Sequence, residues 1–128
     1  MKPLTLEWIA KAEGDFVIVK REMRARKSPN YDAVCFHAQQ CAEKYLKARL
    51  QEASIAFTKT HDLLALLNLV LPVEPGWSSL TSQLTDLTEY AVRYRYPGDS
   101  ADRLEALKAA RMCREVRHEA RRSLGLPV

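Results

Sequence analysis

The chain has 128 residues, 47% of them hydrophobic and 28% charged, with 20 lysines and arginines against 16 aspartates and glutamates. This length is typical of one domain with its own apolar core, so we expect a single domain over residues 1–128. The apolar content excludes a disordered chain. The net charge of +4 favours an anionic partner only slightly.

Three cysteines, Cys35, Cys41 and Cys113, form an odd set without C-x-x-C spacing, which predicts buried, reduced thiols. The longest apolar run, Leu63 to Leu71, is far shorter than the ~20 residues of a membrane span. The first residues lack the apolar stretch of a signal peptide. We therefore expect a cytoplasmic protein with no membrane association.

Prolines and glycines divide the chain into segments with apolar residues at helical spacing. The predicted helices span Thr5 to Arg26, Tyr31 to Glu52, His61 to Leu71, Ser79 to Arg93 and Ala101 to Leu124. Thr60 is the expected N-cap of the third. No segment reads as a strand, and the pattern predicts an all-α fold: an up-and-down helical bundle of four long helices plus one short helix.

The last predicted helix carries all of the net charge, because its apolar side is opposed by a side rich in arginine. This basic face includes Arg103, Arg114, Arg117 and Arg121. Such a face could bind the phosphates of RNA or DNA. A solvated helix face that complements the helix dipole is the alternative.

The second predicted helix has a polar strip on its expected outer side, interrupted by one aromatic residue. The strip consists of Phe36, Gln40, Glu43 and Lys47. Interfaces favour aromatic anchors in a polar surround, so this strip suits a homodimer or a partner helix. Alternatively, the phenylalanine is covered by the chain's own short third helix.

Several segments together resemble the HEPN domain (higher eukaryotes and prokaryotes nucleotide-binding), in its small prokaryotic stand-alone form. The resemblance lies in Tyr31–Ala48, in Lys59–Leu63, and in Tyr90 with Arg95–Gly98, preceded by Trp8, Ala12 and Asp15 at matching spacing. It covers the chain from about Trp8 to Arg122. The resemblance implies a helical bundle that is commonly dimeric.

HEPN proteins of this type often act beside a minimal nucleotidyltransferase, frequently as the toxin of a toxin-antitoxin pair, and many others are RNases. The resemblance therefore implies a homodimer, a nucleotidyltransferase partner, and a tyrosine such as Tyr94 or Tyr96 that the partner could nucleotidylate. The family's RNase motif is an arginine followed by four to six residues and a histidine, shared across a dimer cleft. It works without metal, with histidine as acid or base and arginine stabilising the phosphorane.

That motif is missing where the resemblance places it, because no histidine occurs among residues 96–102. Arg111 and His118 satisfy the spacing later in the chain, and they are the candidate catalytic pair of a metal-independent endoribonuclease. Glu115 and His118 also match the E-x-x-H of di-iron bundles, but the further ligands are absent. We expect no metal and no cofactor.

The candidate nucleotide- or RNA-binding residues come from the two signature segments around Lys59 and Arg95. They are Lys59, His61, Tyr90, Arg93 and Arg95. Arginine binds phosphate through two hydrogen bonds and tyrosine can stack on a base; alternatively, Arg95 bonds carbonyls at a helix end. The leading hypothesis is a nucleotide- or RNA-binding dimer that works with a nucleotidyltransferase, and the alternatives are the endoribonuclease and a purely protein-binding helical module.

Overall fold

A computed structural model describes all residues, 1–128, and contains five α-helices and no strand. The predicted all-α fold is therefore confirmed. The helices are α1 (Pro3–Arg24), α2 (Tyr31–Glu52), α3 (Leu63–Val70), α4 (Thr81–Thr88) and α5 (Arg103–Ser123). None of them combines the length and apolar character that crossing a bilayer requires.

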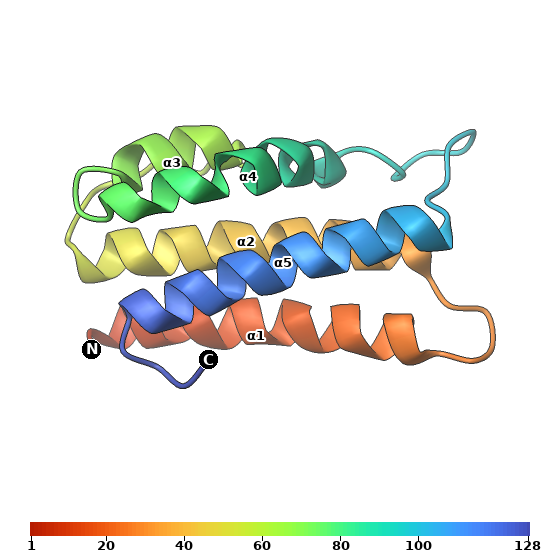
Figure 1. Cartoon of the computed structure of the whole chain (residues 1–128), viewed down its shortest axis with the longest axis horizontal. Helices are drawn as coiled ribbons and strands as arrows, with labels where there is room; N and C mark the ends of the chain where they lie inside the picture. The colour runs from red at the N-terminus through yellow and green to blue at the C-terminus, as the bar shows by residue number, and fades with distance from the viewer.

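Helix α2 is the centre of the bundle, and more than half of its residues are buried. Helix α1 runs antiparallel to α2 on one side, with Thr5 Oγ1 donating to Glu52 Oε1 at 2.9 Å. Helix α5 runs parallel to α2, because Ala101 N donates to Asp32 near the start of both helices. Helices α3 and α4 form an antiparallel pair on the opposite side from α1 (Figure 1).

Three helices begin at side-chain caps that the sequence supplies. Asn30 accepts from Ala33 N at 3.0 Å, and Asp102 accepts from Glu105 N at 2.8 Å. The prediction of Thr60 as the cap of α3 is wrong, because Asp62 accepts from the backbone N–H groups of Leu64 and Ala65. The cap therefore lies two residues later than predicted.

The fourth predicted helix is shorter than expected, so three helices are long and two are short. Instead of one helix from Ser79 to Arg93, the chain forms a 3-10 helix (Pro75–Leu80), α4, and a second 3-10 helix (Glu89–Ala91). The hydroxyls of Thr85 and Thr88 donate to backbone carbonyls four residues earlier, a contact that bends and weakens helices.

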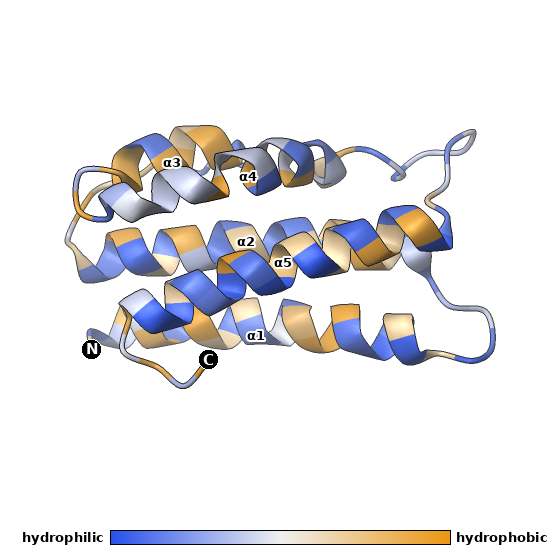
Figure 2. Cartoon of the chain, viewed as in Figure 1, coloured by the Kyte–Doolittle hydropathy of each residue, from blue (hydrophilic) through white to orange (hydrophobic).

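The core contains residues from all five helices, and hydrophilic residues predominate along the visible side of α5 (Figure 2). All three cysteines are free and buried, as predicted. Burial is the main reason why the pKa of Cys35 rises to about 12. Trp77 is fully buried, and its indole N–H donates to Ser123 Oγ at 3.0 Å.

Candidate functional site

The segment between α2 and α3, residues 53–62, folds back along α2. Gln39 Nε2 on α2 donates to the backbone oxygen of His61 at 3.1 Å. Farther along, Arg49 Nε donates to Glu74 Oε1 at 3.0 Å. Helix α3 therefore begins beside the middle of α2 and runs in the same direction, which places residues 59–62 over α2.

This fold-back changes the predicted outer strip of α2. Phe36 and Gln40 are half-buried, but Glu43 and Lys47 are only 3% and 5% exposed. The expectation that the whole strip lies on the outside is therefore wrong for Glu43 and Lys47. We refer to Phe36, Gln40, Glu43 and Lys47, together with the groups that cover them, as the α2 face.

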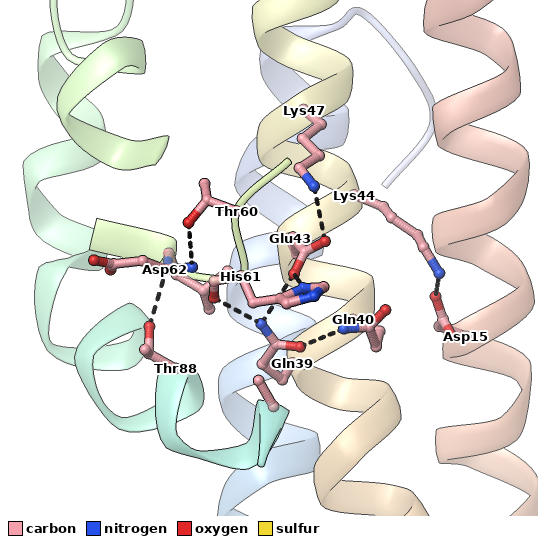
Figure 3. A network of polar contacts seen from close by, with 12 residues as sticks. Asp15, Gln39, Gln40, Glu43, Lys44, Lys47, Thr60, His61, Asp62 and Thr88 are labelled. Atoms are coloured by element: carbon pink, nitrogen blue, oxygen red, sulfur yellow. Dashed lines mark hydrogen bonds and ion pairs between the residues drawn. The ribbon is translucent and has the colours of Figure 1, made fainter. Parts of the chain in front are cut away.

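A buried carboxylate organises the centre of the α2 face (Figure 3). Glu43 Oε2 accepts from Lys47 Nζ at 2.9 Å, and Glu43 Oε1 lies 2.7 Å from His61 Nδ1. Gln39 Nε2 also donates to Glu43 Oε1, at 3.3 Å, and Gln40 donates to Gln39 Oε1. Because each oxygen is bonded, the charge of Glu43 is compensated inside the fold.

His61 is the surface end of this network. Its side chain is 69% exposed, although the carboxylate that holds it is 4% exposed. With Nδ1 occupied by Glu43, Nε2 has no hydrogen bond within the chain. A carboxylate on one nitrogen fixes the orientation of an imidazole and makes the other nitrogen available to a ligand.

A second carboxylate network joins α1 to the same side of α2. Asp15 is 7% exposed, and its two oxygens contact His37 Nδ1 at 2.7 Å and Lys44 Nζ at 2.5 Å. Lys44 and Asp15 lie beside the Glu43 network in Figure 3. Asp15 thus occupies the Lys44 ammonium, so the remaining free cations of the α2 face are Lys59 and an arginine of the loop after α4.

That loop brings Arg95 onto the other end of the α2 face. The Arg95 guanidinium lies over the Phe36 ring at 5.7 Å and donates to the carbonyl of Ala91 at 3.4 Å. The hydrogen bond to the carbonyl matches the predicted alternative in which Arg95 bonds carbonyls at a helix end. The stacking of Arg95 on Phe36 is a contact that the sequence did not predict. Phe36 and Glu43 are seven residues apart, so Arg95 and His61 occupy sites separated by roughly 10 Å along α2.

Two other predicted ligand residues take part in a separate cluster. Tyr90 is 3% exposed, its hydroxyl donates to Glu105, and burial raises its pKa. Arg93 stacks on Tyr94 at 4.6 Å and pairs with Asp99 at 3.4 Å. Tyr90 cannot stack on a base without leaving the core, and its burial argues against the predicted role of Tyr90 as a binding residue. Lys59 is exposed.

The predicted basic face of α5 is not uniformly free. Arg117 makes two hydrogen bonds to Glu13 of α1, at 2.7 and 2.8 Å, and Arg121 lies 3.5 Å from the same carboxylate. Burial raises the pKa of Glu13, but hydrogen bonds from Arg117 and Tyr45 and the charges of both arginines lower it more. Two of the four predicted cations thus hold α5 against α1, whereas Arg103 and Arg114 are exposed.

The predicted catalytic pair also lies on α5. Arg111 and His118 are exposed, and neither has a hydrogen bond to the rest of the chain. Two turns of helix separate them, roughly 10 Å. Arg111 and Lys108 line a shallow cleft of about 350 Å³ between α4 and α5, opposite Asp86 and Glu89. The pair is therefore not assembled within one copy of the chain.

Comparison with protein families identifies the fold. The family model of the HEPN domain matches residues 5–123, nearly the whole chain. The chain belongs to the HEPN-domain family. No curated protein and no solved structure matches it.

In this HEPN chain, the fold brings together segments that are far apart in the sequence. The strip of α2, His61 of the second signature segment and Arg95 of the third meet on the α2 face. Sequence reasoning missed the contacts between them because each is formed by a loop. One signal was present for the pairing: Lys47 follows Glu43 by four residues, the spacing of a helical ion pair. The spacing does not indicate that the pair is buried.

Proposed function

We propose that this HEPN protein binds a nucleotide or RNA, and that the α2 face is the binding surface. The proposal rests on one observation: His61 and Arg95, from two separate signature segments, lie at the two ends of the same helical strip. Arg95 has no carboxylate partner within the chain, and Nε2 of His61 has no hydrogen bond within it. Both groups are therefore available to an external ligand, and the arginine suits an anion.

The chemistry of the two ends is complementary to a nucleotide. Arg95 can donate two parallel hydrogen bonds to a phosphate. Because Nδ1 of His61 donates to Glu43, Nε2 of the neutral ring accepts a hydrogen bond from a ribose hydroxyl, and it donates to a phosphate only when the ring is doubly protonated. Lys59 adds a free cation beside His61. A separation of roughly 10 Å suits one nucleotide or two successive positions of an RNA chain.

Titration of ATP, AMP and a short single-stranded RNA against the full chain, at low and physiological salt, tests the proposal. We expect His61→Ala and Arg95→Ala each to weaken binding about tenfold or more. The matched controls are His118→Ala and Arg111→Ala, which remove the same side-chain types from α5 and should leave the affinity unchanged. Absence of binding at both salt concentrations would eliminate the ligand-binding proposal.

The same proposal includes partners: a homodimer, and a nucleotidyltransferase with which the protein forms a toxin-antitoxin-like pair in the cytoplasm. Tyr96 is 73% exposed, whereas Tyr94 is half-buried against Tyr90, so Tyr96 is the better acceptor for a nucleotidyl group. Co-purification with a nucleotidyltransferase encoded beside it, followed by mass spectrometry, tests the pairing. Co-purification without any nucleotide or RNA affinity would instead support a purely protein-binding module.

An endoribonuclease remains the second candidate, favoured by the exposure of both Arg111 and His118 and by the absence of internal partners for either. A composite site would require a second copy to bring its Arg111 near His118. Incubation of RNA with the protein in EDTA, with His118→Ala as the comparison, tests whether the protein is an endoribonuclease that uses this pair. Cleavage that the substitution abolishes would support the endoribonuclease, and cleavage that it leaves unchanged would remove this pair.

A further inference from the structure

Helix α1 has an outward side that no other part of the chain covers. Seven positions along it follow one another at alternating spacings of four and three residues, and all seven are exposed. We call this stripe the α1 seam; it consists of Pro3, Glu7, Ala10, Gly14, Val17, Arg21 and Arg24. The alternating spacing is that of the contact positions in coiled coils, in which two helices pack along their whole length.

Glycine at the middle of the seam has no explanation within one copy of the chain. Gly14 lies in the interior of α1, where glycine destabilises a helix relative to alanine. A methyl group built at Gly14 would meet nothing within 4 Å, so the fold leaves room for alanine. Close approach of a second helix is a reason for glycine at such a position, because it lets two backbones come together.

The order of residues along the seam is self-complementary. Small or apolar residues, Ala10, Gly14 and Val17, occupy its centre, and Val17 is 44% exposed. An acid, Glu7, lies on the N-terminal side and a base, Arg21, lies on the C-terminal side. A twofold axis through Gly14 therefore brings Glu7 of one copy opposite Arg21 of the other, twice by symmetry.

We propose that α1 packs antiparallel against α1 of a second copy, with the two helices crossing at Gly14. This proposal rests on the homodimer of the proposed function and assigns its interface to α1. It moves the interface away from the predicted strip Phe36, Gln40, Glu43 and Lys47, two members of which are paired inside the fold. The α2 face then stays open to ligand in each copy.

Sedimentation equilibrium of the full chain between ~1 and ~100 µM tests the interface, because weak dimers dissociate in this range. Val17→Glu places two like charges near the centre of the crossing, and we expect the dimer mass to fall to that of a monomer. The matched control is Leu104→Glu, at an apolar position of α5 that is 61% exposed; this variant should remain dimeric. Far-UV circular dichroism confirms that both variants are folded.

A charge exchange tests the antiparallel register. Glu7→Arg replaces two attractions with two repulsions and should weaken the dimer about tenfold. Glu7→Arg combined with Arg21→Glu should restore the wild-type affinity. Gly14→Ala should also weaken the dimer while leaving the monomer as stable as the wild type or more so.

Three results overturn the proposal: a wild-type protein that is monomeric at ~100 µM, a Val17→Glu variant that stays dimeric, or an exchange that restores nothing. The nucleotide titrations are independent, since His61 lies outside the seam. Loss of ligand binding in His61→Ala alongside an intact dimer bears on the α2 face only. The failure of one proposal is therefore distinguishable from the failure of the other.

Discussion

The most informative perturbation of stability is removal of the carboxylate beneath His61. In Glu43→Ala, Lys47 loses its ion-pair partner while its side chain remains 7% exposed. The Trp8 ring, 5.5 Å from Lys47 Nζ, offers a cation–π contact but no hydrogen-bond acceptor of equal strength. Removing one member of a buried ion pair costs about 3–5 kcal/mol, because the other charge is left unpaired.

The free energy of unfolding of native domains is about 5–15 kcal/mol, so the expected loss is a large fraction of the total stability. Equilibrium urea denaturation measures it. His61→Ala serves as the comparison, because it removes an exposed partner of the same carboxylate and should cost less than about 1 kcal/mol. Glu43→Ala combined with Lys47→Met removes both charges and should recover about 2 kcal/mol or more of the loss.

A loss below about 1 kcal/mol in Glu43→Ala would refute the buried ion pair. The same conclusion would follow if Lys47→Met failed to recover stability in the double variant. Either result would mean that Lys47 reaches water and that the fold-back of residues 53–62 does not cover the pair. The account of His61 as the exposed end of a rigid network would then lose its basis.

Three further predictions concern other parts of the bundle. Because the pKa of Glu13 is lowered in the fold, its ionised form stabilises the protein fully above its ordinary pKa, and this stabilisation is lost as the pH falls through the lowered value. In Glu13→Gln, the urea concentration at the unfolding midpoint should therefore fall less steeply on acidification than in the wild type. An equally steep fall would contradict this prediction. All three thiols are buried, and burial raises the pKa of Cys35 and Cys41. The thiols should therefore resist an aromatic disulfide reagent at pH 8 until the protein is unfolded, and rapid reaction of the native protein would count against their burial. Ser123→Ala should cost about 1–3 kcal/mol by leaving the Trp77 indole N–H unpaired, measured by urea denaturation, whereas a neutral effect would show that another acceptor replaces the hydroxyl.

The fold was largely predictable because helical periodicity and proline breaks are local properties of the chain. The apolar positions of α2, such as Val34, Ala38 and Cys41, are all buried as their spacing predicts. The errors occur where two local signals compete. Thr60 and Asp62 can both cap a helix. Asp62 does so, while the hydroxyl of Thr60 accepts a hydrogen bond from the backbone N–H of Asp62.

The candidate site was less predictable because its contacts are non-local. A helical projection places Glu43 and Lys47 outside the apolar stripe of α2, but His61 of the returning loop contacts Glu43 and Trp8 of α1 lies against Lys47, and both residues are buried. The same applies to Glu13, whose pairing with Arg117 of α5 spans 104 residues of sequence. Sequence spacing identified the residue types, but the direction of the loops decided which ones meet.

The central claim is that the α2 face binds a nucleotide or RNA. The most direct measurement is the affinity of the full chain for a short RNA and for ATP, compared between the wild type, His61→Ala and His118→Ala. We predict that His61→Ala weakens binding about tenfold or more and that His118→Ala does not. Equal affinities for all three proteins, or a loss confined to His118→Ala, would contradict the claim.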